Sequence, residues 1–89
     1  MIVIKTTVIL LIFNSKVMKA IINLTQTMKM PCEITSVSDN EVSFKITKDI
    51  ATADNLNALL FMKARLYEFS TEISVDIARE SVLSIHFVD

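Results

Sequence analysis

The sequence predicts a small domain of the mainly β class, and three observations support this prediction. Apolar and polar residues alternate with period two over residues 32–35, 42–47, 73–77 and 83–87, as is typical of strands that bury one face. The chain has 89 residues, enough for a single hydrophobic core. Its apolar fraction of 52% is too high for a disordered chain. We therefore expect one domain over residues 1–89, a six- or seven-stranded antiparallel barrel.

The first strand is expected at residues 2–13, with a turn at 14–16 and a second strand at about 17–26. The apolar run is shorter than the roughly 20 residues of a transmembrane helix, and residues 14–18 are a poor signal-peptide cleavage site. We expect no membrane contact, and we expect residues 1–17 to form an extra N-terminal strand and turn. Because both faces of 2–13 are apolar, both need cover, and a second copy of the chain is the simplest cover. We therefore expect a homodimer formed through this strand.

A first hairpin is predicted where residues 32–35 and 42–47 alternate. A loop of Asp39, Asn40 and Glu41 places Ile34 opposite Ile46, with apolar side chains on one face. This register needs a left-handed conformation at Glu41, which costs a non-glycine residue roughly 1 kcal/mol. The chain contains no glycine, so tight turns are expected at Asn and Asp instead, and Asp54-Asn55 is a further candidate.

A second hairpin is predicted at the C-terminal end, closed through residues 79–81. It pairs Ile77 with Leu83, and the residues on either side continue the same register. Val75 then lies opposite Ile85, and Ile73 lies opposite Phe87. Alternation and turn length agree on this pairing.

The segment 53–69 is compatible with two structures. Its Ala, Leu, Met, Lys and Arg residues favour a helix, which Thr52 or Asp54 could cap. The alternating positions 60, 62, 64 and 66 are all apolar and favour a strand instead. We expect a helical turn at 52–58 followed by a strand, and the alternative is one helix over 53–69 in an α+β fold.

The composition argues against enzymatic chemistry. Without glycine there is no phosphate-binding P-loop, no dinucleotide fingerprint and no nucleophile elbow. His86 and Cys32 are the single histidine and the single cysteine, and nothing in the sequence places them together. They are too few for a zinc site. We expect no catalytic residue, no metal, no cofactor and no enzymatic activity.

Two groups of residues are candidates for binding. The net charge is −1, so no strong field attracts nucleic acid, but the first 32 residues carry lysines and no acid. These lysines form either a basic arm for an anionic ligand or charges that protect strand edges. Phe61, Arg65 and Tyr67 alternate on the expected strand. We expect them to bind a partner protein or to pack across strands, with base stacking as the alternative.

Residues 30–89 resemble the PilZ family of small β-barrels, which act as cyclic di-GMP receptors in bacteria. The resemblance lies in residues 32–38 and 42–46 and in the closing Ser84-Ile85-His86-Phe87. It implies nucleotide contacts at Lys16, Lys19 and Ser38. The paired-arginine motif is missing, and of the motif D/N-x-S-x-x-G only Ser38 remains. Lysine does not reproduce the bidentate grip of arginine.

The resemblance therefore implies a degenerate PilZ-like domain that has lost tight cyclic di-GMP binding. It would serve as a cytoplasmic, regulatory protein-interaction module. Two alternatives stay open: a true cyclic di-GMP receptor, and a small phage or orphan protein that inhibits a host protein.

Overall fold

The computed structural model describes residues 18–88. The strand expected at 2–13, its turn at 14–16 and the dimer built on it lie outside the described residues. Within 18–88, six antiparallel strands form one sheet, joined by one α-helix and one 3-10 helix, and strands make up 52% of the structure. The mainly β class is thus confirmed. The elements are β1 (Met18–Asn23), β2 (Lys29–Val37), β3 (Glu41–Thr47), α2 (Ala53–Phe61), β4 (Arg65–Glu68), β5 (Glu72–Ala78), η1 (Arg79–Ser81) and β6 (Ser84–Phe87).

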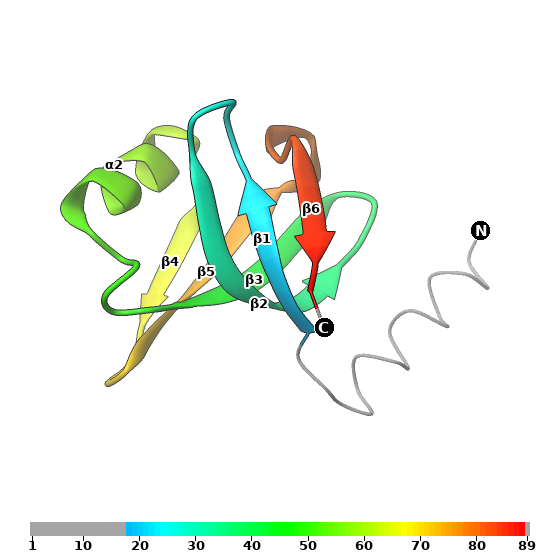
Figure 1. Ribbon diagram of the computed structural model, residues 1–89. Helices are drawn as coiled ribbons and strands as arrows, with labels where there is room; N and C mark the ends of the chain where they lie inside the picture. Colours follow the sequence, from blue (N-terminus) through cyan, green and yellow to red (C-terminus); the bar gives the residue numbers. More distant parts are fainter. Residues whose placement is uncertain (1–17, 89) are drawn as a thin grey trace.

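The sheet has the strand order β4-β5-β3-β2-β1-β6. It curls strongly, and Figure 1 shows β1 and β6 passing in front of β3 and β5. Among the described residues, however, the sheet does not close, so β4 and β6 are its two edges. The structure is therefore an open, curled sheet and not the closed barrel that we expected.

The predicted hairpin of β2 and β3 is present, but the predicted register is wrong. Ile34 pairs with Phe44 and not with Ile46, and the register shifts between Ile34 and Ser36 at a β-bulge. The loop is 38–40, so Glu41 already belongs to β3 and has no positive φ. The bulge absorbs one residue, which keeps the apolar side chains on one face without a left-handed residue in the loop.

The predicted C-terminal hairpin is wrong, although both of its strands exist. β5 pairs with β3 and β4, while β6 pairs with β1. The 3-10 helix η1 carries the chain between them, and the Arg79 N–H donates to the Asn40 carbonyl at 2.9 Å. Val82 then enters the core and Leu83 is exposed, the reverse of the predicted pattern. Residues that can close a tight hairpin also form a 3-10 turn, and burial of Val82 favours the turn.

Segment 53–69 folds as a helix followed by a strand, as expected, but the helix is longer than the predicted 52–58 turn. Thr52 caps α2, its Oγ1 accepting the Asn55 N–H at 3.2 Å. The candidate turn at Asp54-Asn55 is therefore wrong, because both residues lie inside the helix.

α2 ends in a Schellman motif, in which the last carbonyls are capped by the following N–H groups. The N–H of Ala64 donates to the Leu59 carbonyl at 3.0 Å, and the N–H of Lys63 to the Leu60 carbonyl at 2.9 Å. Within residues 18–88, Lys63 alone has a positive φ, of 65°. Leu59 and Ala64 are both buried, which adds the apolar contact that usually accompanies this motif.

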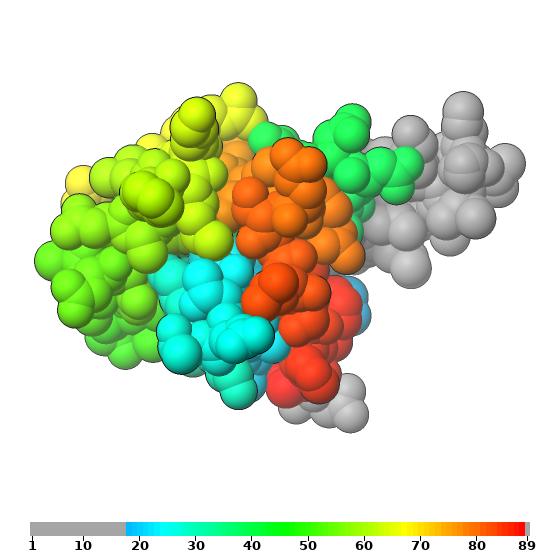
Figure 2. Space-filling model, turned by 90° about the horizontal axis from the view of Figure 1, so that it is seen from above, coloured from blue at the N-terminus to red at the C-terminus, as the bar shows by residue number. Residues whose placement is uncertain are grey.

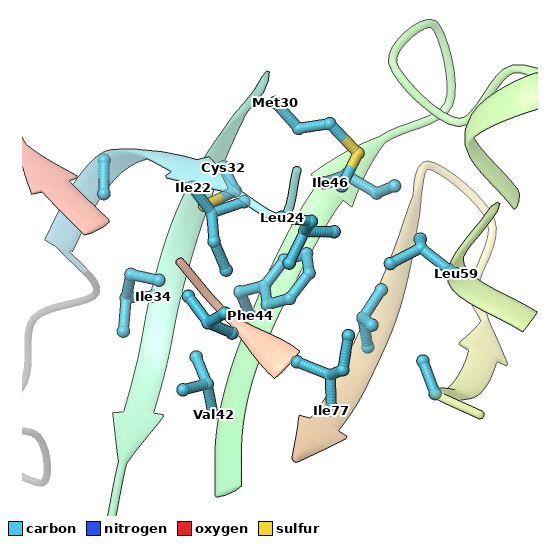
Figure 3. Close-up of a cluster of buried hydrophobic side chains, with 14 of the residues drawn as sticks. Ile22, Leu24, Met30, Cys32, Ile34, Val42, Phe44, Ile46, Leu59 and Ile77 are labelled. Carbon is cyan, nitrogen blue, oxygen red and sulfur yellow. The ribbon is translucent and has the colours of Figure 1, made fainter. Parts of the chain in front are cut away.

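The core lies on the concave, inner face of the sheet. Alternate residues of β1, β2, β3 and β5 point into it, while Leu59 of α2 and Val82 cover it from outside the sheet. The ring of Phe44, 1% exposed, lies at its centre (Figure 3). The opposite, outer face carries mainly polar and charged side chains, with Ile21 and Pro31 among them. The binding surfaces described below lie on this outer face and along the β4 edge.

Candidate functional site

The residues implied as nucleotide contacts do not form one site. Lys16 lies outside the described residues, and Lys19 is on the outer face of β1, paired in register with Glu33. Ser38 lies in the β2–β3 loop, five positions beyond Glu33, or roughly 15 Å along the strand. Its Oγ accepts the N–H groups of Asn40 and Glu41 at 3.2 and 3.0 Å, which fixes the turn. The structure thus separates Lys19 from Ser38 and uses the Ser38 hydroxyl within the loop.

Phe61, Tyr67 and Phe69 are exposed aromatic residues at the end of α2, within β4 and directly after β4, and we name these three residues the aromatic edge. Phe61, the last residue of α2, is 87% exposed. Tyr67 on β4 is 45% exposed, and Phe69 directly after β4 is 53% exposed. In Figure 2 the residues of the α2–β4 connection project from the surface in yellow-green. The Schellman turn at Lys63 separates the helix from the strand and leaves the Phe61 side chain in solvent.

Arg65, the third predicted partner-binding residue, is already held by two carboxylates. Its Nη2 contacts Glu41 Oε2 on β3 and lies 3.6 Å from Asp76 Oδ2 on β5. Asp76 in turn accepts a hydrogen bond from the Ser43 hydroxyl at 2.7 Å. This network connects β3, β5 and β4 on the outer face. Arg65 therefore positions the β4 edge, and its exposed guanidinium keeps donors available for a partner.

A groove on the outer face was not foreseen from the sequence, and we name it the β2 groove. It has a volume of about 560 Å³, within the usual range of ligand pockets. Its apolar lining comes from Ile21, Pro31, Ile50 and Val88. Its charged lining consists of Lys19, Glu33, Lys45, Asp49 and Glu72. The run Ala20-Ile21-Ile22 was the available signal, because two adjacent isoleucines on a strand place one of them on each face.

The lining of the β2 groove carries a slight excess of negative charge, with three carboxylates and two ammonium groups. Lys45 Nζ lies 3.5 Å from Glu72 Oε2, so these two charges offset each other. The hydrogen bond from the Thr47 hydroxyl lowers the pKa of Asp49 below its usual value, which keeps that carboxylate ionised. A polyanionic ligand is therefore disfavoured here, and a basic group is favoured.

The chemically reactive residues are placed apart. Cys32 points into the core, and burial raises the pKa of its thiol to about 12, so it carries no thiolate at neutral pH. His86 lies on β6 in register with Ile21, on the outer face. Within residues 18–88, no three His, Cys, Asp or Glu side chains are grouped so that they could hold a metal ion. Cys32 and His86 therefore lie on opposite faces of the sheet.

Comparisons of the chain with protein-family models, curated proteins and solved structures gave no match. Over residues 18–88, no helix has the length and hydropathy needed to span a bilayer. The fold defines the chain as a small domain with an open antiparallel sheet and one helix in its described part. The PilZ-like resemblance stays a prediction.

Proposed function

We propose that this protein is a non-catalytic, regulatory protein-interaction module whose partner binds at the aromatic edge. The observation that carries the proposal is the 87% exposure of Phe61 beside an edge strand. Aromatic residues and arginine are enriched where protein interfaces concentrate their binding energy. Tyr67, Phe69 and Arg65 supply more such residues within the same short segment.

The mode of binding that fits this surface is the addition of a strand to the sheet. Among the described strands, β4 pairs with β5 alone, so the backbone N–H and C=O groups of its other edge are left for a partner strand. Main-chain hydrogen bonds would supply affinity, and the three aromatic rings would select the partner. β4 has only four residues, which also limits unwanted edge-to-edge pairing.

We propose in addition that the module is cytoplasmic, homodimeric through residues 2–13 and related to a degenerate PilZ domain. Cyclic di-GMP binding is the less supported alternative, because the Ser38 hydroxyl serves the loop and the β2 groove has more acids than bases. A small inhibitor of a host protein would use the same aromatic edge. The identity of the captured partner distinguishes an inhibitor of a host protein from a regulatory module.

The first experiment is affinity capture with the full chain, followed by titration of the purified partner. Phe61→Ala and Tyr67→Ala are each expected to weaken binding at least tenfold, as hot-spot residues do. Leu83→Ala is the matched control, because Leu83 is an exposed apolar residue, 61% exposed, that lies outside the aromatic edge. Equal losses for all three variants would contradict the proposed surface.

The second experiment is a calorimetric titration of the full chain with cyclic di-GMP at moderate salt. We expect no heat of binding at a Kd tighter than about 100 μM, or about −5.5 kcal/mol. Micromolar binding that is lost on changing Lys16 and Lys19 to Ala would instead establish the receptor function.

A further inference from the structure

The β2 groove has an apolar floor that solvent reaches. Ile21 is 37% exposed and Val88 is 47% exposed, and Pro31 lies beside Ile21 in the β1–β2 register. Ile21 and Pro31 face outward from β1 and β2, which are each paired on both sides, whereas Val88 follows the edge strand β6. The apolar surface of the groove is therefore formed by side chains and not by the unpaired backbone of an edge strand.

One carboxylate in the β2 groove, that of Glu33, has no partner among the described residues. Glu33 is half-buried, and its carboxylate makes no hydrogen bond or ion pair with any residue that the structure describes. It pairs in register with Lys19 and Lys45, but neither ammonium reaches ion-pair distance, and Lys45 is held by Glu72. A half-buried carboxylate is stabilised by a cation that approaches from outside. The groove thus fits a segment that presents aliphatic side chains next to a basic one.

We propose that the occupant of the β2 groove is the chain's own N-terminal segment, residues 1–17, with Lys5 placed at Glu33. The segment has this composition: it is rich in aliphatic residues, contains lysine and has no acid. It joins β1 at Met18, next to the groove residue Lys19. Seventeen extended residues span about 56 Å, more than the 38 Å length of the molecule, so the segment is long enough to reach the groove.

The covalent connection favours the chain's own segment over one from another molecule. A short tether gives an effective concentration of about 1 mM, which a second copy does not reach in dilute solution. An alternating strand at 2–13 has two apolar faces, so one face would cover the β2 groove and the other would remain for the proposed homodimer. This proposal concerns only where residues 1–17 bind. If they do not bind in the β2 groove, the proposed homodimer and the proposed partner site at the aromatic edge are unaffected.

Disulfide trapping in the full chain tests this placement. Ile21→Cys is combined in turn with a cysteine at each of positions 2 to 8, and the dilute protein is oxidised. We expect an intrachain disulfide, seen as a faster-migrating monomer on a non-reducing gel, for positions next to Lys5. The matched control replaces Leu60, an apolar α2 residue that is 55% exposed and outside the groove. Each single-cysteine variant controls for reaction with the buried Cys32.

Three outcomes overturn the proposal. Disulfide-linked dimers in place of intrachain links would show that a second copy's segment fills the groove. Equal trapping with the cysteine at position 60 would show that the segment has no fixed place. Charge reversal gives an independent reading: Lys5→Glu and Glu33→Lys should each lower the Tm by about 2–4 °C, and the double variant should restore it. Additive losses would exclude the Lys5–Glu33 contact.

Discussion

Replacing Lys63 by glycine is expected to stabilise the protein. Lys63 has φ of 65° at the end of α2, in the left-handed region where a side chain with a Cβ is strained. Relief of that strain gains about 1–2 kcal/mol. The greater freedom of glycine in the unfolded chain costs about 0.4–1 kcal/mol. The net gain is about 1 kcal/mol, which for a domain of this size raises the Tm by about 4–8 °C.

Thermal and urea unfolding of the full chain, followed by circular dichroism, measures this gain. Lys63→Ala is the matched control, because it removes the charge and the aliphatic stem but keeps the Cβ and therefore the strain. We expect Lys63→Ala to have the stability of the wild type or slightly less. If both variants gain equally, loss of the lysine side chain and not backbone strain explains the effect. If Lys63→Gly gains nothing, the Schellman motif does not limit stability.

Three further predictions concern other parts of the chain. Thr52→Ala removes the cap of α2 and should cost about 1 kcal/mol in urea unfolding, whereas Thr52→Ser should cost much less; equal costs would contradict the capping role. Burial raises the pKa of Cys32 from 9.0 to about 12, so its thiol should resist alkylation at pH 8. The free energy of unfolding should also fall as the pH rises above 9, because there only the unfolded chain loses this proton. A Cys32→Ala variant with the same pH profile would assign that fall to another group. Val8→Glu, expected on the face of strand 2–13 opposite to Lys5, should convert the proposed homodimer to a monomer in light scattering, and an unchanged mass would remove residues 2–13 from the interface.

The sequence predicts the position of the strands better than their pairing. The apolar and polar residues of β3 and β5 alternate because one face of each strand is buried. The same alternation is expected in any fold that buries that face, whichever strands pair with it. Pairing depends on long-range packing. Val75 and Ile85 have the pattern of hairpin neighbours, but Val75 pairs with Phe44 and Leu66, and Ile85 pairs with Ile22. The alternation alone could not show this, because each of these partners is also apolar.

The position of the left-handed residue could not be read from the sequence either. A chain without glycine gives no marker for positive φ, so the prediction depended on the hairpin register and selected Glu41. The β-bulge removes the need for it there. The helix end requires it at Lys63 instead, a residue type with no preference for that conformation.

The binding surfaces were predictable to different degrees. Phe61 and Tyr67 were identified from their spacing, and the structure leaves both exposed. The spacing could not show that Phe61 ends a helix while Tyr67 lies on a strand. The β2 groove combines residues from four strands, a turn and the segment after β6, so no local pattern could reveal it.

The pairing of β6 with β1 has a consequence for how the chain folds during synthesis. Asn23 Nδ2 bonds to the Ser84 hydroxyl 61 positions later, and the N–H of Val88 bonds to the Lys19 carbonyl at 3.0 Å. The first described strand is thus completed by the last, a contact of high sequence separation that slows folding. Until residues 84–88 emerge from the ribosome, one edge of β1 has no partner among the described strands. The nascent chain then carries an aggregation-prone edge, which binding by a chaperone would protect.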